Sequence, residues 1–269
     1  MAELQNRVVM VTGASSGIGE ATARSFARRG ASVILVSDHA DALDRVTASI
    51  AEAGGTAASM VADFSNPAEV EDLLSRAETY FGPLDILVNN AGVGMRALVG
   101  ERPMEDTRFL FEVNFFALAS LCGQVLPGMM ERRSGRIINV SSAAGQFGCA
   151  NMSAYSASKG AVHAFTQALR VEALAHGVFV SEIVPISVRT QFFEHVRGKA
   201  YKPLGVVLTP QLVAERIVRC AASSRPKPEI WPYLLIRLVF LLNVLAPGLL
   251  VLANLRTFLR NRTAHHESI

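Results

Sequence analysis

The chain has 269 residues, of which 50% are hydrophobic and 18% charged, with a formal net charge of +3. This length and apolar content can bury a large core, and they favour one α/β domain over two. Three cysteines without C-x-x-C spacing argue against a disulfide framework and a zinc site, and they fit a reducing cytoplasm.

Short apolar runs alternate with amphipathic stretches along most of the chain. Because the first run directly follows a polar N-terminus, no export signal is predicted. The segments between the runs have helical periodicity and carry glycine near their ends. This alternation predicts a parallel sheet with helices on both faces and ligands at the carboxyl ends of the strands. The predicted strands are residues 8–11, 33–37, 57–63, 85–90, 136–141 and 179–185.

A glycine-rich turn follows the first predicted strand and opens a predicted helix. Its glycines are Gly13, Gly17 and Gly19. Glycine lets the backbone approach a pyrophosphate, whose charge the N–H groups and the helix dipole then hold. A purely structural turn is the alternative, but the order of strand, turn and helix is the one that a dinucleotide site requires.

Tyr155 and Lys159 are four residues apart, which places them on one face of a helix. An ammonium beside a phenol stabilises the phenolate, so the pair is a candidate acid/base device. Ser142 precedes Tyr155 by 13 residues. His163, one turn after Lys159, is predicted to pack rather than to act in catalysis. The histidines are scattered, and no metal site is predicted.

Taken together, these motifs resemble the classical short-chain dehydrogenase/reductase family. Thr12, Gly13, Gly17 and Gly19 fit its T-G-x-x-x-G-x-G pattern, residues 89–92 fit N-N-A-G, and Tyr155 with Lys159 fits Y-x-x-x-K. The resemblance covers about residues 5–225. It implies a Rossmann-type doubly wound fold, mainly a seven-stranded parallel sheet with its last strand near 228–231. We therefore expect a catalytic domain at 1–228 and an apolar helical tail at 229–269, and family members are commonly dimers or tetramers.

The resemblance also implies the cofactor site. Asp63 matches the family residue that contacts the adenine amino group, and an N-cap is its structural alternative. Ile186 stands where the family has glycine, so the path of that loop is expected to differ. The residues expected to bind NAD or NADP are Gly13, Ser15, Ser16, Gly17, Ile18, Gly19, Ser37, Asp38, Asp63, Phe64, Asn90, Ala91, Gly92, Tyr155, Lys159, Pro185, Val188 and Thr190.

The choice between NAD and NADP depends on the end of the second strand. A carboxylate there accepts a hydrogen bond from a ribose 2′-hydroxyl and repels a 2′-phosphate. Ser37 stands where NAD-preferring relatives carry Asp, and Asp38 stands where many NADP-preferring relatives carry Arg. Ser16 replaces the cation that some NADP users place in the glycine-rich turn. We therefore favour NAD.

Four residues match the catalytic residues of the family: Asn114, Ser142, Tyr155 and Lys159. The resemblance makes Tyr155 the proton donor in carbonyl reduction and the proton acceptor in alcohol oxidation. Lowering a phenol pKa from near 10 by about three units needs about 4 kcal/mol of preferential stabilisation of the anion, which Lys159 and oxidised nicotinamide can share. Ser142 would bind the substrate oxygen, and Asn114 would position a water for proton relay.

Residues 230–260 lie outside the resemblance and are dominated by Leu, Val and Ile. Asn243 and Pro247-Gly248 interrupt this short run, so no membrane span is predicted. Six of the 26 Lys and Arg residues, but one of the 23 acidic residues, lie at 225–262. Peripheral contact with an anionic membrane is one interpretation. A packed substrate lid or subunit interface is the other, and both remain open.

The leading functional hypothesis is an oxidoreductase that transfers a hydride between nicotinamide and a secondary alcohol or ketone of a small apolar substrate, such as a steroid, a retinoid or a fatty-acyl compound. Residues 191–208 would form the substrate loop. The alternative enzyme is a 3-oxoacyl carrier-protein reductase, against which the long tail argues. A nucleotide-binding scaffold without turnover is a further alternative. We expect no nucleic-acid partner, and a homodimer or homotetramer.

Overall fold

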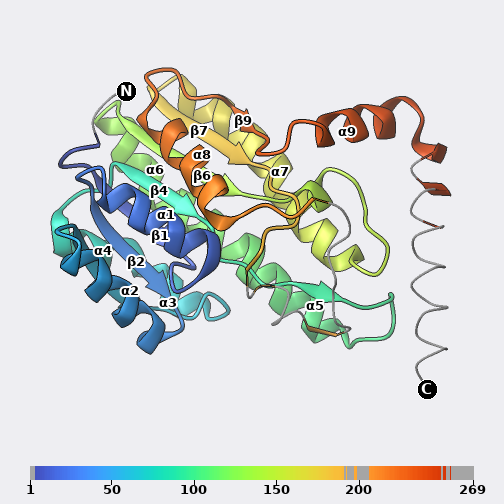
Figure 1. The fold of residues 1–269 in the computed structure, drawn as a ribbon, viewed down its shortest axis with the longest axis horizontal. Coiled ribbons are helices and arrows are strands. Elements are labelled where there is room, and N and C mark those ends of the chain that lie inside the picture. The colour runs from blue at the N-terminus through green and yellow to red at the C-terminus, as the bar shows by residue number, and fades with distance from the viewer. Residues whose placement is uncertain are drawn as a thin grey trace.

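The computed structural model describes residues 4–190, 192, 197–198, 206–249, 251–252 and 255. Seven parallel strands form one sheet in the order β3-β2-β1-β4-β6-β7-β9 (Figure 1). All six strands predicted from the sequence are present, and the expected seventh is β9. The strands are β1 (Val8–Thr12), β2 (Ser32–Ser37), β3 (Thr56–Val61), β4 (Ile86–Asn89), β6 (Gly135–Val140), β7 (Val178–Ile183) and β9 (Glu229–Ile230).

Helices connect the strands and cover both faces of the sheet (Figure 1). The strand order reverses between β1 and β4, which is where doubly wound folds bind their ligands. The helices are α1 (Gly17–Ala27), α2 (Ala40–Glu52), α3 (Pro67–Glu71), α4 (Leu73–Phe81), α5 (Met104–Phe111), α6 (Ala117–Glu131), α7 (Ser153–Leu174), α8 (Pro210–Ala222) and α9 (Ile236–Leu245), with a π-helical turn η1 (Glu112–Phe116) and a 3-10 turn η2 (Ala143–Gly145).

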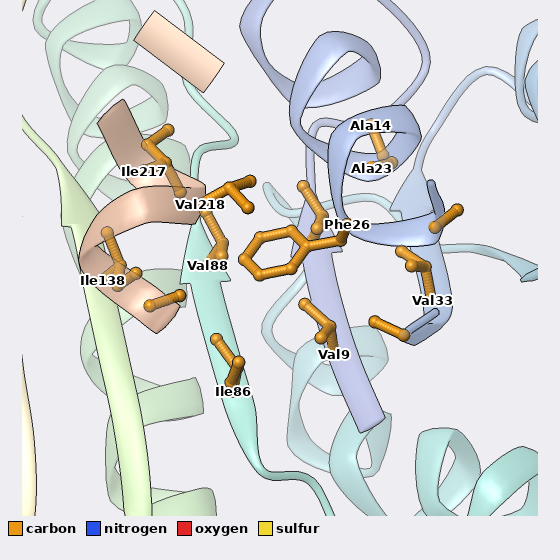
Figure 2. Packing of buried hydrophobic residues seen from close by; sticks show 14 of the residues in the cluster. Val9, Ala14, Ala23, Phe26, Val33, Ile86, Val88, Ile138, Ile217 and Val218 are labelled. Atoms are coloured by element: carbon orange, nitrogen blue, oxygen red, sulfur yellow. The ribbon is translucent and has the colours of Figure 1, made fainter. Parts of the chain in front are cut away.

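Two hydrophobic layers sandwich the sheet. All five residues of β1 are buried, as expected of a central parallel strand with helices on both sides. On one face Phe26 of α1 packs among Val9, Val88 and Val218, which come from β1, β4 and α8 (Figure 2). The opposite layer is formed with α3, α4, α6 and α7. Helices therefore cover both faces of the sheet, so a ligand site is expected at the carboxyl ends of the strands.

A second sheet was not predicted. It pairs β5 (Met95–Arg96) with β8 (Arg197–Gly198), two residues each. Strands this short leave no periodic signal in the sequence. Residues 191, 193–196 and 199–205 of the expected substrate loop lie outside the described residues.

One helical stretch, Met104–Glu131, is long and apolar enough to cross a membrane, with a mean hydropathy of 1.6 over its most apolar window. It comprises α5, η1 and α6. Leu121, Val125 and Met129 of α6 are buried in the layer beneath the sheet. We therefore assign this stretch to the core.

The C-terminal arm consists of the residues that follow β9, described at 231–249, 251–252 and 255, and it extends away from the sheet (Figure 1). Strand β9 lies just past residue 228, so the first two residues of the predicted tail belong to the sheet. Phe240 of α9 packs against Trp231, with ring centroids 6.2 Å apart. The leucines that follow are exposed. Residues 250, 253–254 and 256–269, including Arg256, Arg260 and Arg262, lie outside the described residues.

Candidate active site

A cavity of about 510 Å³ lies where the carboxyl ends of β1, β2, β4, β6 and β7 meet. All but two of the predicted site residues line it. The exceptions are Gly19, which is buried in the glycine-rich turn, and Asn114, which lies behind Gly92. The predicted residues thus come together at one cavity from segments more than 170 residues apart.

The glycine-rich turn has the geometry that a dinucleotide needs. Gly13 and Gly17 have φ angles of +63° and +57°, a backbone region that favours glycine. A Cβ on Gly19 would lie 2.0 Å from the carbonyl oxygen of Gly13. Ser16, the N-cap of α1, makes no capping hydrogen bond with its side chain. The N–H groups of the first helical turn are thus left to bind an anion, and the turn fits a pyrophosphate.

The end of β2 presents hydroxyl and carboxylate groups to the cavity. Ser37 Oγ lies 2.9 Å from Ser15 Oγ, and it donates to Asp38 Oδ1 at 3.0 Å. His39 Nε2 is 3.8 Å from the same carboxylate oxygen. The exposed Asp38 carboxylate is thus held at the cavity rim, where it can accept a hydrogen bond from a ribose hydroxyl.

Asp63 follows β3 and forms a local turn. Its Oδ1 accepts from both the backbone N–H and the hydroxyl of Ser65, each at 2.8 Å. The N-cap of α3 is Asn66, whose side chain accepts from Ala68 N. Asp63 therefore does not cap that helix, and its second carboxylate oxygen can meet the adenine side of a cofactor. The neighbouring Phe64 is buried against the core.

The segment after β4 is tied to the glycine-rich turn. The Thr12 hydroxyl accepts from the backbone N–H groups of Asn90 and Ala91, at 2.9 and 3.0 Å. Asn90 Nδ2 donates to the carbonyl oxygens of Thr12 and Gly13. These bonds hold the glycine-rich turn and the segment after β4 next to each other.

Tyr155 and Lys159 are buried on α7 and line the cavity. Lys159 Nζ donates to the carbonyl oxygen of Val140 at 3.1 Å. Burial lowers the pKa of Lys159 to about 8, and the charge of Glu182 opposes this effect. Ser142, also at the cavity, caps η2 by accepting from Ala144 N at 3.2 Å.

Asn114 lies in the π-helical turn η1, where one extra residue widens the helix. Its side chain donates to the carbonyl oxygen of Val93 and to Ser158 Oγ, both at 3.0 Å, and accepts from Val93 N at 2.8 Å. A Cβ on Gly92 would lie 3.0 Å from Asn114 Oδ1 and 3.3 Å from Lys159 Nζ. The Asn114 amide and the Lys159 ammonium thus both lie close to Gly92.

The loop after β7 closes over the glycine-rich turn. A Cβ on Gly17 would lie 2.9 Å from Thr190 Cγ2, and Val188 pairs with Leu208. Pro185 accepts from Ala143 N at 2.9 Å. Ile186, which replaces the family glycine, packs against two core clusters and lines the cavity. The Ile186 side chain fits between these clusters, and it adds an apolar residue to the cavity wall.

Sequence reasoning missed the apolar walls of the cavity, which include Phe109, Phe147, Met152 and Phe192. Phe192 packs on Tyr155 with ring centroids 5.9 Å apart. Phe147 and Met152 lie between Ser142 and Tyr155 in the sequence. Their place between two predicted catalytic residues is the one sequence signal that could have identified them as cavity residues. Cys149 also lines the cavity, but burial raises the pKa of its thiol and disfavours a nucleophilic thiolate.

The parallel sheet with its glycine-rich turn, and the cavity that holds Ser142, Tyr155 and Lys159, fit an oxidoreductase that acts on CH–OH groups with NAD or NADP. The family model for short chain dehydrogenases matches residues 7–200. The chain belongs to the short-chain dehydrogenase/reductase family.

Relatives of known sequence and structure agree with this assignment. The chain is 36% identical to a ketoacyl reductase from Nostoc sp., over 83% of this chain and 78% of the relative. It is 34% identical to a 3-oxoacyl-[acyl-carrier-protein] reductase from Synechocystis sp., over 81% and 90%. A short chain dehydrogenase/reductase from Burkholderia phymatum in complex with NAD superposes with a TM-score of 0.83 at 27% identity, covering 93% of this chain and 96% of that one. A metagenomic short-chain oxidoreductase in complex with NADP gives 0.76 at 30% identity, covering 86% and 97%.

Proposed function

We propose that the protein interconverts a secondary alcohol and a ketone of a lipophilic substrate, with NAD as its preferred cofactor. The observation that carries the proposal is the single cavity that joins the glycine-rich turn to Ser142, Tyr155 and Lys159 and has apolar walls beside the tyrosine. A relative named as a ketoacyl reductase supports a fatty-acyl type of substrate. A relative named as a 3-oxoacyl-[acyl-carrier-protein] reductase supports the alternative enzyme.

The proposed chemistry assigns one task to each side chain. The nicotinamide, when bound, supplies or accepts the hydride. Tyr155 donates its phenolic proton to the oxygen of a ketone, or takes the proton from an alcohol. The Lys159 ammonium stabilises the phenolate and holds the ribose hydroxyls, while Ser142 donates a hydrogen bond to the substrate oxygen. Asn114 holds the segment at Val93 and positions the water for proton relay.

A substrate screen tests this proposal. Purified protein is assayed at 340 nm with NADH and NADPH against apolar ketones and a 3-oxoacyl thioester, and with NAD and NADP against the matching alcohols. The proposal expects turnover of an apolar ketone or alcohol with NAD(H). Turnover of the thioester alone, with NADPH, would instead support the 3-oxoacyl carrier-protein reductase. Tight cofactor binding without turnover of any compound would support the non-catalytic scaffold.

Replacing Asp38 with Asn should weaken the preference for NAD. Removing the negative charge removes its repulsion of a 2′-phosphate, so we expect NADPH to bind about tenfold more tightly, while the hydrogen bond from the NADH ribose hydroxyl loses its charged acceptor and NADH binds several-fold more weakly. Fluorescence titration of both cofactors measures this. Asp41→Asn, on the first turn of α2 and outside the cavity lining, is the matched control. A wild-type protein that binds NADPH more tightly than NADH would contradict the preference.

The C-terminal arm is proposed to dock on a membrane surface, as a unit distinct from the catalytic domain. Ten of its apolar residues are at least half exposed: Leu234, Leu235, Leu238, Leu241, Leu242, Val244, Leu245, Leu249, Val251 and Leu252. A helix with this many exposed apolar side chains favours an apolar medium around it. Arg237 on α9 is exposed, and further arginines follow in the sequence. Basic flanks beside an apolar helix favour an anionic bilayer over a lid or an interface.

The full chain should therefore sediment with phosphatidylglycerol vesicles, and less with phosphatidylcholine vesicles. Each exposed leucine that enters the bilayer contributes about 1.5–3 kcal/mol. The double substitution Leu241→Asp with Leu245→Asp should thus reduce the bound fraction at least tenfold. The control is Val99→Asp, which changes an exposed apolar residue in the turn after β5, away from the arm and from α7. Equal sedimentation of all three proteins would refute membrane docking.

We also propose that the protein is a homodimer or homotetramer. Phe116 at the end of η1 and Val171 and Leu174 on α7 are exposed apolar residues of adjacent elements. Size-exclusion chromatography with light scattering measures the mass of the protein that carries the Leu241→Asp and Leu245→Asp substitutions. A dimer or tetramer that persists in this variant does not associate through the arm.

A further inference from the structure

A small apolar cluster lies between the cavity and the C-terminal arm. Its buried centre consists of Ala143, Val184 and Trp231. Phe147 and Ile186 pack against this centre, and both of them also line the cavity. Trp231 is not a lining residue, so its ring lies one layer behind these two side chains. This part of the cavity wall is therefore two layers thick.

Trp231 is anchored on the sheet. It directly follows β9, and the carbonyl oxygen of Ile230 in β9 accepts a hydrogen bond from Val184 N at 2.9 Å. The indole N–H of Trp231 donates to Glu229 Oε2 at 3.3 Å, which orients the ring. The side chain is buried, although it stands at the end of a strand of two residues. The ring is thus a fixed support for the side chains that pack on it.

Helix α9 of the arm contacts the same ring. Phe240 packs on Trp231 with ring centroids 6.2 Å apart and ring planes inclined by 42°. Phe240 is half-buried, whereas the next two residues, Leu241 and Leu242, are exposed. Apolar contacts therefore lead from α9 through Trp231 to the cavity wall.

The second layer decides how closely the wall can meet an apolar ligand. Phe147 and Ile186 are only half-buried, so few neighbours hold them in place. Removing the ring of Trp231 would leave a void behind them, and side chains beside a void lose van der Waals contacts or move into it. Each methylene that a ligand buries against a close wall contributes about fourfold to its affinity. A wall that recedes loses this gain.

We propose that Trp231 is a positioning residue for the substrate. It holds Phe147 and Ile186 against the apolar part of the substrate, and Phe240 covers it from the other side, so the base of the arm supports the substrate site. The ring acts through the two lining residues and contacts neither substrate nor cofactor. The inference rests on the lipophilic substrate proposed above.

The first test measures how affinity depends on the length of an apolar ketone. Isothermal titration calorimetry of 2-hexanone, 2-octanone and 2-decanone with NAD-saturated protein involves no turnover, because NAD cannot reduce a ketone. We expect wild-type affinity to rise about fourfold per added methylene. In Trp231→Ala this rise should fall below about twofold, with NAD affinity unchanged, while Trp231→Phe keeps a ring and should retain most of the rise.

Two results of the calorimetry would overturn the proposal. One is an unchanged dependence on chain length in a folded Trp231→Ala protein. The other is an equal loss of affinity for all three ketones and for NAD, because a general structural defect acts on every ligand. Phe240→Ala should reduce the chain-length dependence in the same direction, and a dependence equal to that of wild type would exclude the arm from the substrate site.

The second test reads the contacts without any ligand. Trp231 is the only tryptophan of the chain, so tryptophan fluorescence reports on this cluster alone. Phe147→Ala and Ile186→Ala should each shift the emission to longer wavelength and increase its quenching by acrylamide, because they uncover the ring. Phe109→Ala is the matched control, since Phe109 also lines the cavity but packs against the opposite hydrophobic layer. It should leave the emission unchanged.

Unchanged emission in both Phe147→Ala and Ile186→Ala would overturn the proposal, whichever ligand the protein binds. If the wild-type protein binds none of the ketones, the proposed substrate class fails, and the emission still decides whether Trp231 supports the wall. Failure of the proposed function and failure of this inference are therefore separate results.

Discussion

Tyr155→Phe should reduce turnover by about 10³-fold while leaving NADH affinity within about twofold of wild type. General acid/base groups contribute about 10²–10⁴-fold to rate, and the ring that packs against Phe192 is kept. The substitution removes one hydroxyl from a buried side chain that lines the cavity. The loss should therefore appear in kcat, in both directions of the reaction, and not in cofactor binding.

The measurement compares steady-state rates with the best substrate of the screen and fluorescence titration of NADH. Tyr80→Phe is the matched control, because its hydroxyl lies on α4 outside the cavity lining and the side chain is half exposed. That variant should keep full activity. A Tyr155→Phe protein with at least a tenth of wild-type turnover would refute the assignment of Tyr155 as the proton donor.

Local patterns predicted the sheet, and the resemblance to the family named most of the residues that line the cavity. Runs of buried apolar residues mark parallel strands, and the glycines of the first turn are required by backbone geometry. The carboxyl ends of parallel strands meet at one edge, so motifs at strand ends converge there once the fold is known.

Other features depend on register and packing, which the sequence does not display. Glu182 contacts Ser141 and His163, which are 41 and 19 residues away, because β6, β7 and α7 are adjacent. The π-helical turn around Asn114 has no recognised sequence signal, and it aims this side chain at Val93. The apolar pattern of residues 230–260 fits a lid, an interface and a membrane segment equally. The fold adds that the α9 leucines are exposed.

Gly19→Ala should weaken binding of both NADH and NADPH by at least 100-fold and destabilise the protein by about 3 kcal/mol. A Cβ at this position would lie 2.0 Å from the Gly13 carbonyl oxygen and 2.7 Å from Asn90 Nδ2. Neither neighbour can move freely, because Asn90 ties the turn to the segment after β4. Overpacking a rigid contact costs about 1–3 kcal/mol or more. The same displacement moves the N–H groups that would hold the pyrophosphate.

Urea denaturation and fluorescence titration measure the two effects separately. Gly123→Ala is the control, because Gly123 lies within α6 and a Cβ there would meet no atom within 4 Å. Alanine at that helical position should stabilise by up to about 1 kcal/mol and leave cofactor binding unchanged. Full cofactor affinity in a folded Gly19→Ala protein would mean that the turn does not hold the pyrophosphate. Loss of affinity for both cofactors, with Gly123→Ala unaffected, would tie dinucleotide binding to the close approach of α1 and the end of β1.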